Sequence, residues 1–114
     1  MRILDFTIHK QRLTRTSTCD FSGLVAGSAG YLQAKFNFSS EWAECKKAAS
    51  FIIKNANGDV EREYGRLLDE NNTCDIPPEV LTYSEFYVRV KGIKEDVLYR
   101  IETSEIRVTQ EVYY

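Results

Sequence analysis

The most regular alternation of apolar and polar residues runs through residues 31–38, where every second position from Leu32 to Phe38 is apolar. Residues 86–91 repeat this period of two, again with every second residue apolar. Side chains of a β-strand point alternately to its two faces, so each segment is typical of a strand with one buried and one solvated face. The pattern therefore predicts two half-buried strands.

Weaker alternation predicts five further strands, each separated from the next by turn residues. They cover residues 12–17, 49–54, 60–68, 97–103 and 106–112. Asn57-Gly58 lies between two of these segments and predicts a hairpin with a type I′ turn, because both residue types tolerate a positive φ. Pro77-Pro78 cannot donate to a sheet ladder and therefore excludes a central strand at that point.

Helix is expected only in short pieces. Residues 40–48 begin with a capping serine and place acids before lysines, which favours at most one or two helical turns. One further turn is expected at residues 79–81, and the Gly-rich residues 22–30 are expected to form a loop. Many short strands with little helix predict an all-β fold, an antiparallel, immunoglobulin-like β-sandwich of about seven to eight strands in one domain over residues 1–114.

Composition and charge narrow the possible partners of this domain. The chain has 114 residues, 43% of them hydrophobic and 28% charged, which is typical of a folded globular domain. Its formal charge of −2 provides no excess of Lys and Arg to neutralise phosphates, so nucleic-acid binding is not expected. Asp5 interrupts the apolar start, and no stretch is long enough to span a bilayer. We therefore expect synthesis in the cytoplasm, without a secretory signal peptide and without a membrane contact.

Candidate nucleophiles and metal ligands are few and widely spaced. The single histidine, His9, is expected on an exposed strand position, without a base–nucleophile pair. Cys19, Cys45 and Cys74 form no Cys-x-x-Cys pair and are expected to pack as apolar thiols in or near the core. We accordingly expect neither catalytic residues nor a metal site.

Carboxylates do not change this interpretation. Glu61 and Glu63 share one face of a predicted strand, where solvated charge paired with nearby arginines explains them. Acids at relative positions 1, 3, 5 and 12 from Asp59 resemble a calcium loop, but Tyr64 occupies the position that requires glycine. No glycine-rich phosphate-binding motif is present in the sequence. No cofactor is therefore expected.

Exposed aromatic residues on the predicted strands offer a contact surface instead. Five residues are candidates for it: Tyr31, Gln33, Tyr87, Arg89 and Tyr99. A tyrosine ring provides apolar area and a hydroxyl, which suits a protein partner or a sugar ring. The same rings also stabilise a solvated sheet face by cross-strand pairing. Trp42 is expected to close one end of the core, because its large apolar side chain favours burial.

A series of short sequence blocks resembles a known family. In order, the blocks are Leu24–Ser28, Ala34–Ser39, Glu41–Trp42, Ala49–Phe51, Cys74–Pro77 with Glu79–Leu81, and Val90–Gly92. Their order and spacing over about residues 11–110 resemble the N-terminal domain of upper-baseplate and related minor structural proteins of tailed phages that infect Gram-positive bacteria. By their chemistry, Phe36, Phe38, Trp42 and Phe51 of these blocks are expected to fill a core, and Gly92 is expected to permit a turn.

The resemblance implies a non-enzymatic structural protein of a phage or prophage tail or baseplate. It implies a place in the virion after synthesis in the bacterial cytoplasm, contacts with other phage structural proteins, and assembly into a homo-oligomer. The chain ends at Tyr114 without the stalk and receptor-binding domain of longer members, so direct host recognition is not expected. The alternative is a β-sandwich module that binds carbohydrate or a cell surface through its exposed tyrosines.

Overall fold

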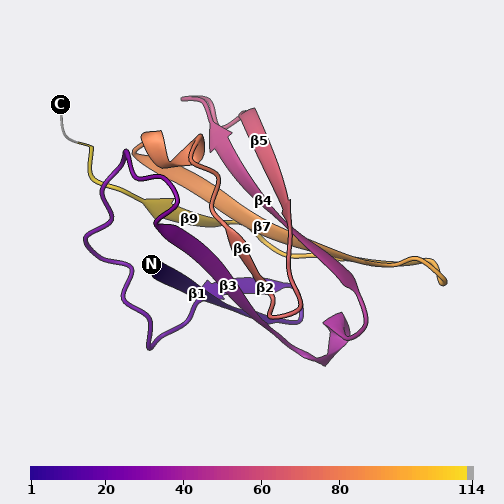
Figure 1. Cartoon of the computed structure of the whole chain (residues 1–114). Coiled ribbons are helices and arrows are strands. Elements are labelled where there is room, and N and C mark those ends of the chain that lie inside the picture. Colours follow the sequence, from indigo (N-terminus) through magenta and orange to yellow (C-terminus); the bar gives the residue numbers. More distant parts are fainter. Residues whose placement is uncertain (113–114) are drawn as a thin grey trace.

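The computed structural model describes residues 1–112, which fold into two packed β-sheets (Figure 1). The last two residues of the predicted domain, 113 and 114, lie outside the described residues. One sheet has four strands in the order β2-β1-β3-β6, and the other has five, in the order β5-β4-β7-β8 with β9 also paired to β7. This arrangement confirms the predicted all-β sandwich, with nine strands in the described residues instead of seven to eight.

The four-stranded sheet is built from β1 (Arg2–His9), β2 (Arg12–Arg15), β3 (Leu32–Phe38) and β6 (Thr73–Asp75). The five-stranded sheet is built from β4 (Lys46–Lys54), β5 (Val60–Leu67), β7 (Glu85–Lys94), β8 (Tyr99–Glu102) and β9 (Ile106–Thr109). Two short 3₁₀ helices complete the described elements: η1 (Ser40–Trp42) and η2 (Val80–Thr82).

All seven predicted strands are present, with ends displaced by a few residues. The main displacement is at β4, which begins at Lys46, so the last residues of the expected helical segment 40–48 are strand and only η1 is helical. η2 follows Pro77-Pro78 as expected, and residues 22–30 form a loop whose only ladder contact in the described chain is a single bridge from Val25 to Glu111.

Two strands were not predicted, and one of them changes the topology. β1 lies in the interior of its sheet, antiparallel to β2 and parallel to β3, with Arg2 opposite Leu32 and Ile8 opposite Phe38. The sandwich is therefore antiparallel in every other strand pairing of the described residues but not in this one. The other missed strand, β6, has three residues and shows almost no pattern.

The hairpin between β4 and β5 forms as predicted, but its turn differs from type I′. Gly58 has a φ of 83°, whereas Asn57 is not among the described non-glycine residues with a positive φ. Asn55 explains the difference, because its side-chain oxygen accepts hydrogen bonds from the backbone N–H groups of Asn57 and Asp59, at 2.9 and 3.1 Å. These bonds hold a longer loop with one left-handed glycine, typical of a type I turn followed by a bulge.

Aromatic residues from both sheets fill the space between them. Phe6 and Phe36 stack with ring centroids 5.2 Å apart, and Phe51 and Phe86 pack from the other sheet. Trp42 is fully buried at the end of this core, as predicted. Its indole N–H donates to the Lys10 carbonyl at 2.7 Å, which satisfies its only polar atom.

Gly92 does not form a turn, so the turn predicted from this glycine is wrong. It lies inside β7, opposite Lys47 and Ile101 on the neighbouring strands. A Cβ atom at this position would come within 2.9 Å of Trp42 Cε3. The glycine is therefore needed because the indole occupies the space of a side chain, and not for conformational freedom.

Candidate functional site

The candidate catalytic and metal-binding residues remain apart in the fold. His9 is exposed at the end of β1, as predicted. Cys45 and Cys74 are buried in the core cluster, and Cys19 is half-buried. Burial raises the pKa of the Cys74 thiol to about 12, so this group stays protonated and unreactive near neutral pH. No three His, Cys, Asp or Glu side chains gather into a possible metal site within residues 1–112.

Tyr31 and Gln33 lie at the outer side of the four-stranded sheet. Tyr31 immediately precedes β3, is half exposed, and accepts a hydrogen bond at its carbonyl from the backbone N–H of Arg2 at 2.9 Å. The amide of Gln33 donates to the Asp75 carboxylate on β6 at 3.1 Å. Gln33 therefore ties β3 to the short edge strand, whereas the half-exposed Tyr31 ring remains open to solvent.

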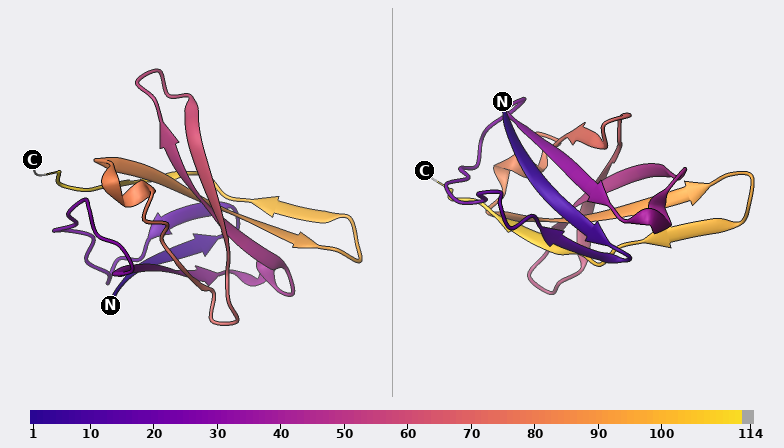
Figure 2. Two further views of the ribbon diagram at one scale, coloured as in Figure 1. Left: turned by 45° about the horizontal axis from the view of Figure 1, so that its top comes forward. Right: turned by 90° about the horizontal axis from the view of Figure 1, so that it is seen from below.

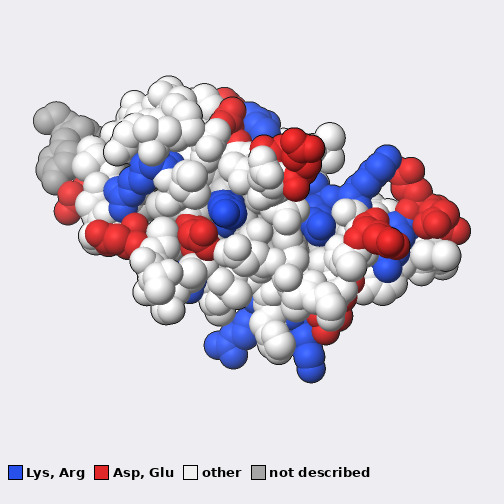
Figure 3. Space-filling view, turned by 60° about the horizontal axis from the view of Figure 1, so that its bottom comes forward, with Lys and Arg blue, Asp and Glu red and all other residues white. Residues whose placement is uncertain are grey.

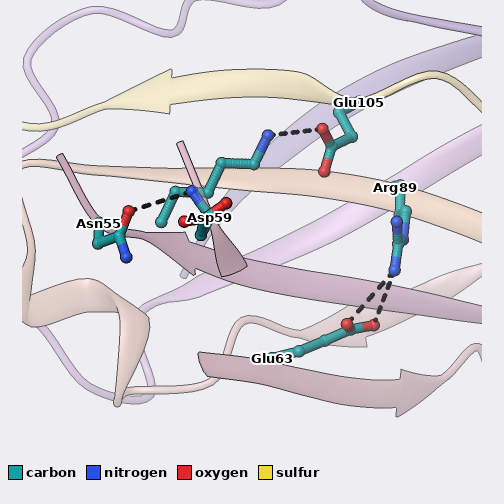
Figure 4. Close-up of polar contacts among 6 residues, drawn as sticks. Asn55, Asp59, Glu63, Arg89 and Glu105 are labelled. Carbon is teal, nitrogen blue, oxygen red and sulfur yellow. Dashed lines mark hydrogen bonds and ion pairs between the residues drawn. The ribbon is translucent and has the colours of Figure 1, made fainter. Parts of the chain in front are cut away.

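Tyr87 and Arg89 lie on the outer face of the other sheet, over a buried apolar residue. Ile52 of β4 points away from the core, yet it is fully buried, because Glu63 and Tyr87 flank it on the neighbouring strands. Arg89 contacts both carboxylate oxygens of Glu63, at 3.3 and 3.4 Å (Figure 4). This pair joins β7 to β5 across the intervening strand.

Lys54 makes two further contacts on the same outer face of the sheet. Its ammonium nitrogen lies 4.2 Å from the centroid of the Tyr87 ring. The same nitrogen is 2.7 Å from the carboxylate of Glu105 (Figure 4). An ammonium over an aromatic face is stabilised by the ring quadrupole, so the Tyr87 ring is already occupied within the chain. A sugar stacking on Tyr87 would have to displace this ammonium group.

The Tyr99 side chain is also occupied by contacts within the chain, at the far end of the molecule. Its hydroxyl donates to the Glu41 carbonyl at 2.8 Å, and the Lys94 ammonium lies 4.8 Å from its ring centroid. The five predicted contact residues thus lie on two outer faces and at one end of the sandwich, and the structure does not bring them together. Their role in an interface remains a prediction.

Sequence reasoning missed two features that the strand topology creates. The first is the hairpin of β7 and β8, residues 93–100, which projects from the body and which we call the arm (Figure 2). The second is a cavity of about 440 Å³ at the start of β4, the end of β5 and the loop that follows, which we call the hollow. The apolar pair Val97-Leu98 directly after the charged run 94–96 was the available signal for the arm, and nothing local marked the hollow.

Comparison of the chain with protein-family models, curated protein sequences and solved structures finds no match. Within the described residues, no helix is long and apolar enough to cross a membrane.

Proposed function

We propose that this chain is a non-enzymatic structural protein that acts through contacts with other proteins, in the tail or baseplate of a tailed phage or prophage. The observation that carries the proposal is the projecting arm, whose tip presents Val97 and Leu98 to solvent, Leu98 fully exposed. Large apolar side chains presented together on a protruding element mark protein contact sites. The proposed partners are other phage structural proteins and further copies of this chain.

The phage assignment rests on the ordered sequence blocks. Phe36, Trp42 and Phe51 from those blocks lie in the core, so they support a shared architecture and say nothing of a binding surface. We place the protein in the virion after synthesis in the bacterial cytoplasm. Neither a nucleic acid nor a membrane is part of the proposal, because the charge is slightly negative and balanced.

The test is to locate the protein in particles. Tailed particles purified from cells that carry this gene are labelled with a gold-conjugated antibody against the chain and imaged by electron microscopy. Labelling at the distal end of the tail is expected, and mass spectrometry of the same particles should detect the chain. Particles that lack the protein, while the cells contain it, would contradict the proposal.

The carbohydrate-binding alternative has weaker support in the geometry. Binding modules stack a sugar on open aromatic faces, whereas lysines cover the rings of Tyr87 and Tyr99, and Tyr31 lies on the other sheet. Sedimentation with purified cell wall separates the two functions. Saturable binding that Tyr31→Ala abolishes would favour the glycan module over the assembly protein.

A further inference from the structure

The arm carries the most exposed large apolar side chain in the described part of the protein. The last paired residues of the hairpin are Lys94 and Tyr99, and the segment between them forms the tip (Figure 2). Leu98 is fully exposed there and Val97 is 56% exposed. Because both side chains expose apolar surface to water, burial of Val97 and Leu98 against a partner would be favourable.

The hollow contains the second most exposed of these side chains. Leu67, at the end of β5, is 80% exposed, and Leu68 beside it is half-buried. Both residues line the hollow, together with Cys45 of the buried core cluster. The arm of the same chain leaves it open, since Leu98 at the arm tip remains fully exposed.

The charges of the two features are complementary. The arm tip places Glu95 and Asp96 directly before its apolar pair, and Arg100 after it. Among the residues that line the hollow, the order along the chain is the reverse: Lys46 and Lys47 come before Leu67 and Leu68, and Asp69 and Glu70 come after them. Figure 3 shows acidic and basic side chains gathered at the projecting end of the molecule.

Within one chain, one acidic residue of the arm is already paired with one basic residue of the hollow. Lys46 contacts Glu95 at 2.9 Å, with both side chains about 70% exposed. An ion pair this exposed contributes little to stability, because water screens it. It can therefore exchange for the same pair between two copies at little cost.

We propose that the arm of one copy inserts Leu98 into the hollow of a second copy, where it packs on Leu67. The inference rests on the proposed assembly function and names its self-contact. Arm and hollow are different surfaces, so the contact either is reciprocal between two copies around a two-fold axis or runs head-to-tail into a ring or an open chain. In both cases each copy uses one arm and one hollow.

Single substitutions in each half test the contact. The solution mass of the wild-type chain, measured by light scattering across concentration, should rise as copies associate. Leu98→Asp and Leu67→Asp should each weaken association about tenfold to a hundredfold, from lost apolar burial. Val60→Asp is the matched control, because Val60 is a half-exposed apolar residue on the same strand, outside the hollow, and association should be unchanged. Thermal unfolding of all three variants checks that they fold.

Mixing the two variants identifies the geometry. The Leu98→Asp chain keeps an intact hollow, and the Leu67→Asp chain keeps an intact arm, so an equimolar mixture should form a one-to-one dimer that neither chain forms alone. A mixture that stays monomeric while the wild type associates would overturn arm insertion, as would association that survives either substitution. A wild-type chain that stays monomeric throughout would also overturn it, without affecting the labelling of particles that tests the phage assignment.

Discussion

The contact of Gly92 with Trp42 allows the packing of this core to be tested by adding one methyl group. In Gly92→Ala, the new Cβ would lie 2.9 and 3.0 Å from two carbons of the indole and 3.1 Å from Cys45 Cβ. These distances are well inside van der Waals contact, and the fully buried indole is held by its hydrogen bond to Lys10. The side chain or the strand must therefore shift.

Two terms of opposite sign determine the size of the effect. Overpacking of a core costs about 1–3 kcal/mol of the free energy of unfolding. Replacing glycine inside a strand recovers roughly 0.5–1 kcal/mol of backbone entropy. In Gly65→Ala on β5 only the gain in backbone entropy applies, because a Cβ there meets no atom within 4 Å. The difference between the two variants therefore isolates the packing term, about 1–3 kcal/mol.

Urea unfolding is a suitable assay, since Trp42 is the single tryptophan of the chain and reports on this site by fluorescence. Circular dichroism provides a second probe that does not depend on the indole environment. We expect Gly65→Ala to be as stable as the wild type or slightly more stable. Gly92→Ala should unfold about 4–12 °C below Gly65→Ala in a thermal scan.

Equal stability of the two alanine variants would refute the steric argument. A second comparison uses Trp42→Phe, which removes the ring atoms that the new methyl group would meet. Gly92→Ala should cost less in the Trp42→Phe background than in the wild type, with a coupling energy of about 0.5–3 kcal/mol. Purely additive effects would show that the indole is not the obstacle.

Three further predictions concern other parts of the fold. Burial raises the folded-state pKa of Cys74 from 9.0 to about 12, so its contribution to stability is complete below pH 9 and is lost as the pH rises toward 12. When the free energy of unfolding is measured against pH, Cys74→Ala should therefore give a flatter curve than the wild type over this range. Asn55→Ala removes two hydrogen bonds at the β4–β5 turn and should cost about 1 kcal/mol, with faster amide exchange at Asn57. Glu63→Gln weakens a pair about one-third exposed with Arg89, so chemical denaturation should detect a loss below about 1 kcal/mol, and a larger loss would mean that the charge is effectively desolvated.

Strand positions could be predicted from the sequence because alternation is a local property. Residues 31–38 and 86–91 lie in strands almost as expected, since their apolar positions face one core. β1 carries the same signal at Leu4, Phe6 and Ile8, all buried, so this strand was predictable from the alternation alone. Alternation does not reveal which strands pair, and the parallel contact of β1 with β3 has no local signature.

The candidate contact residues illustrate the same limit. Alternation predicted that Tyr87 and Arg89 point away from the core, and they do. It could not predict that Lys54 and Glu63, from two other strands, would cover and pair with them. The positions of the arm and the hollow also depend on strand register. The arm extends β7 past the start of its paired neighbour β4, and the hollow lies where β5 ends.

The exposed edge of β5 has a consequence for aggregation. No strand of the described chain pairs with its outer side, and an unpaired edge is a template for sheet extension between molecules. Two β5 edges that met antiparallel around a two-fold axis would place each face against the same face. In the register that sets Glu61 opposite Glu63, Arg62 would also face the same arginine of the second copy. The edge therefore repels its own copy, which protects concentrated protein against fibrous stacking and leaves head-to-tail contacts free to form.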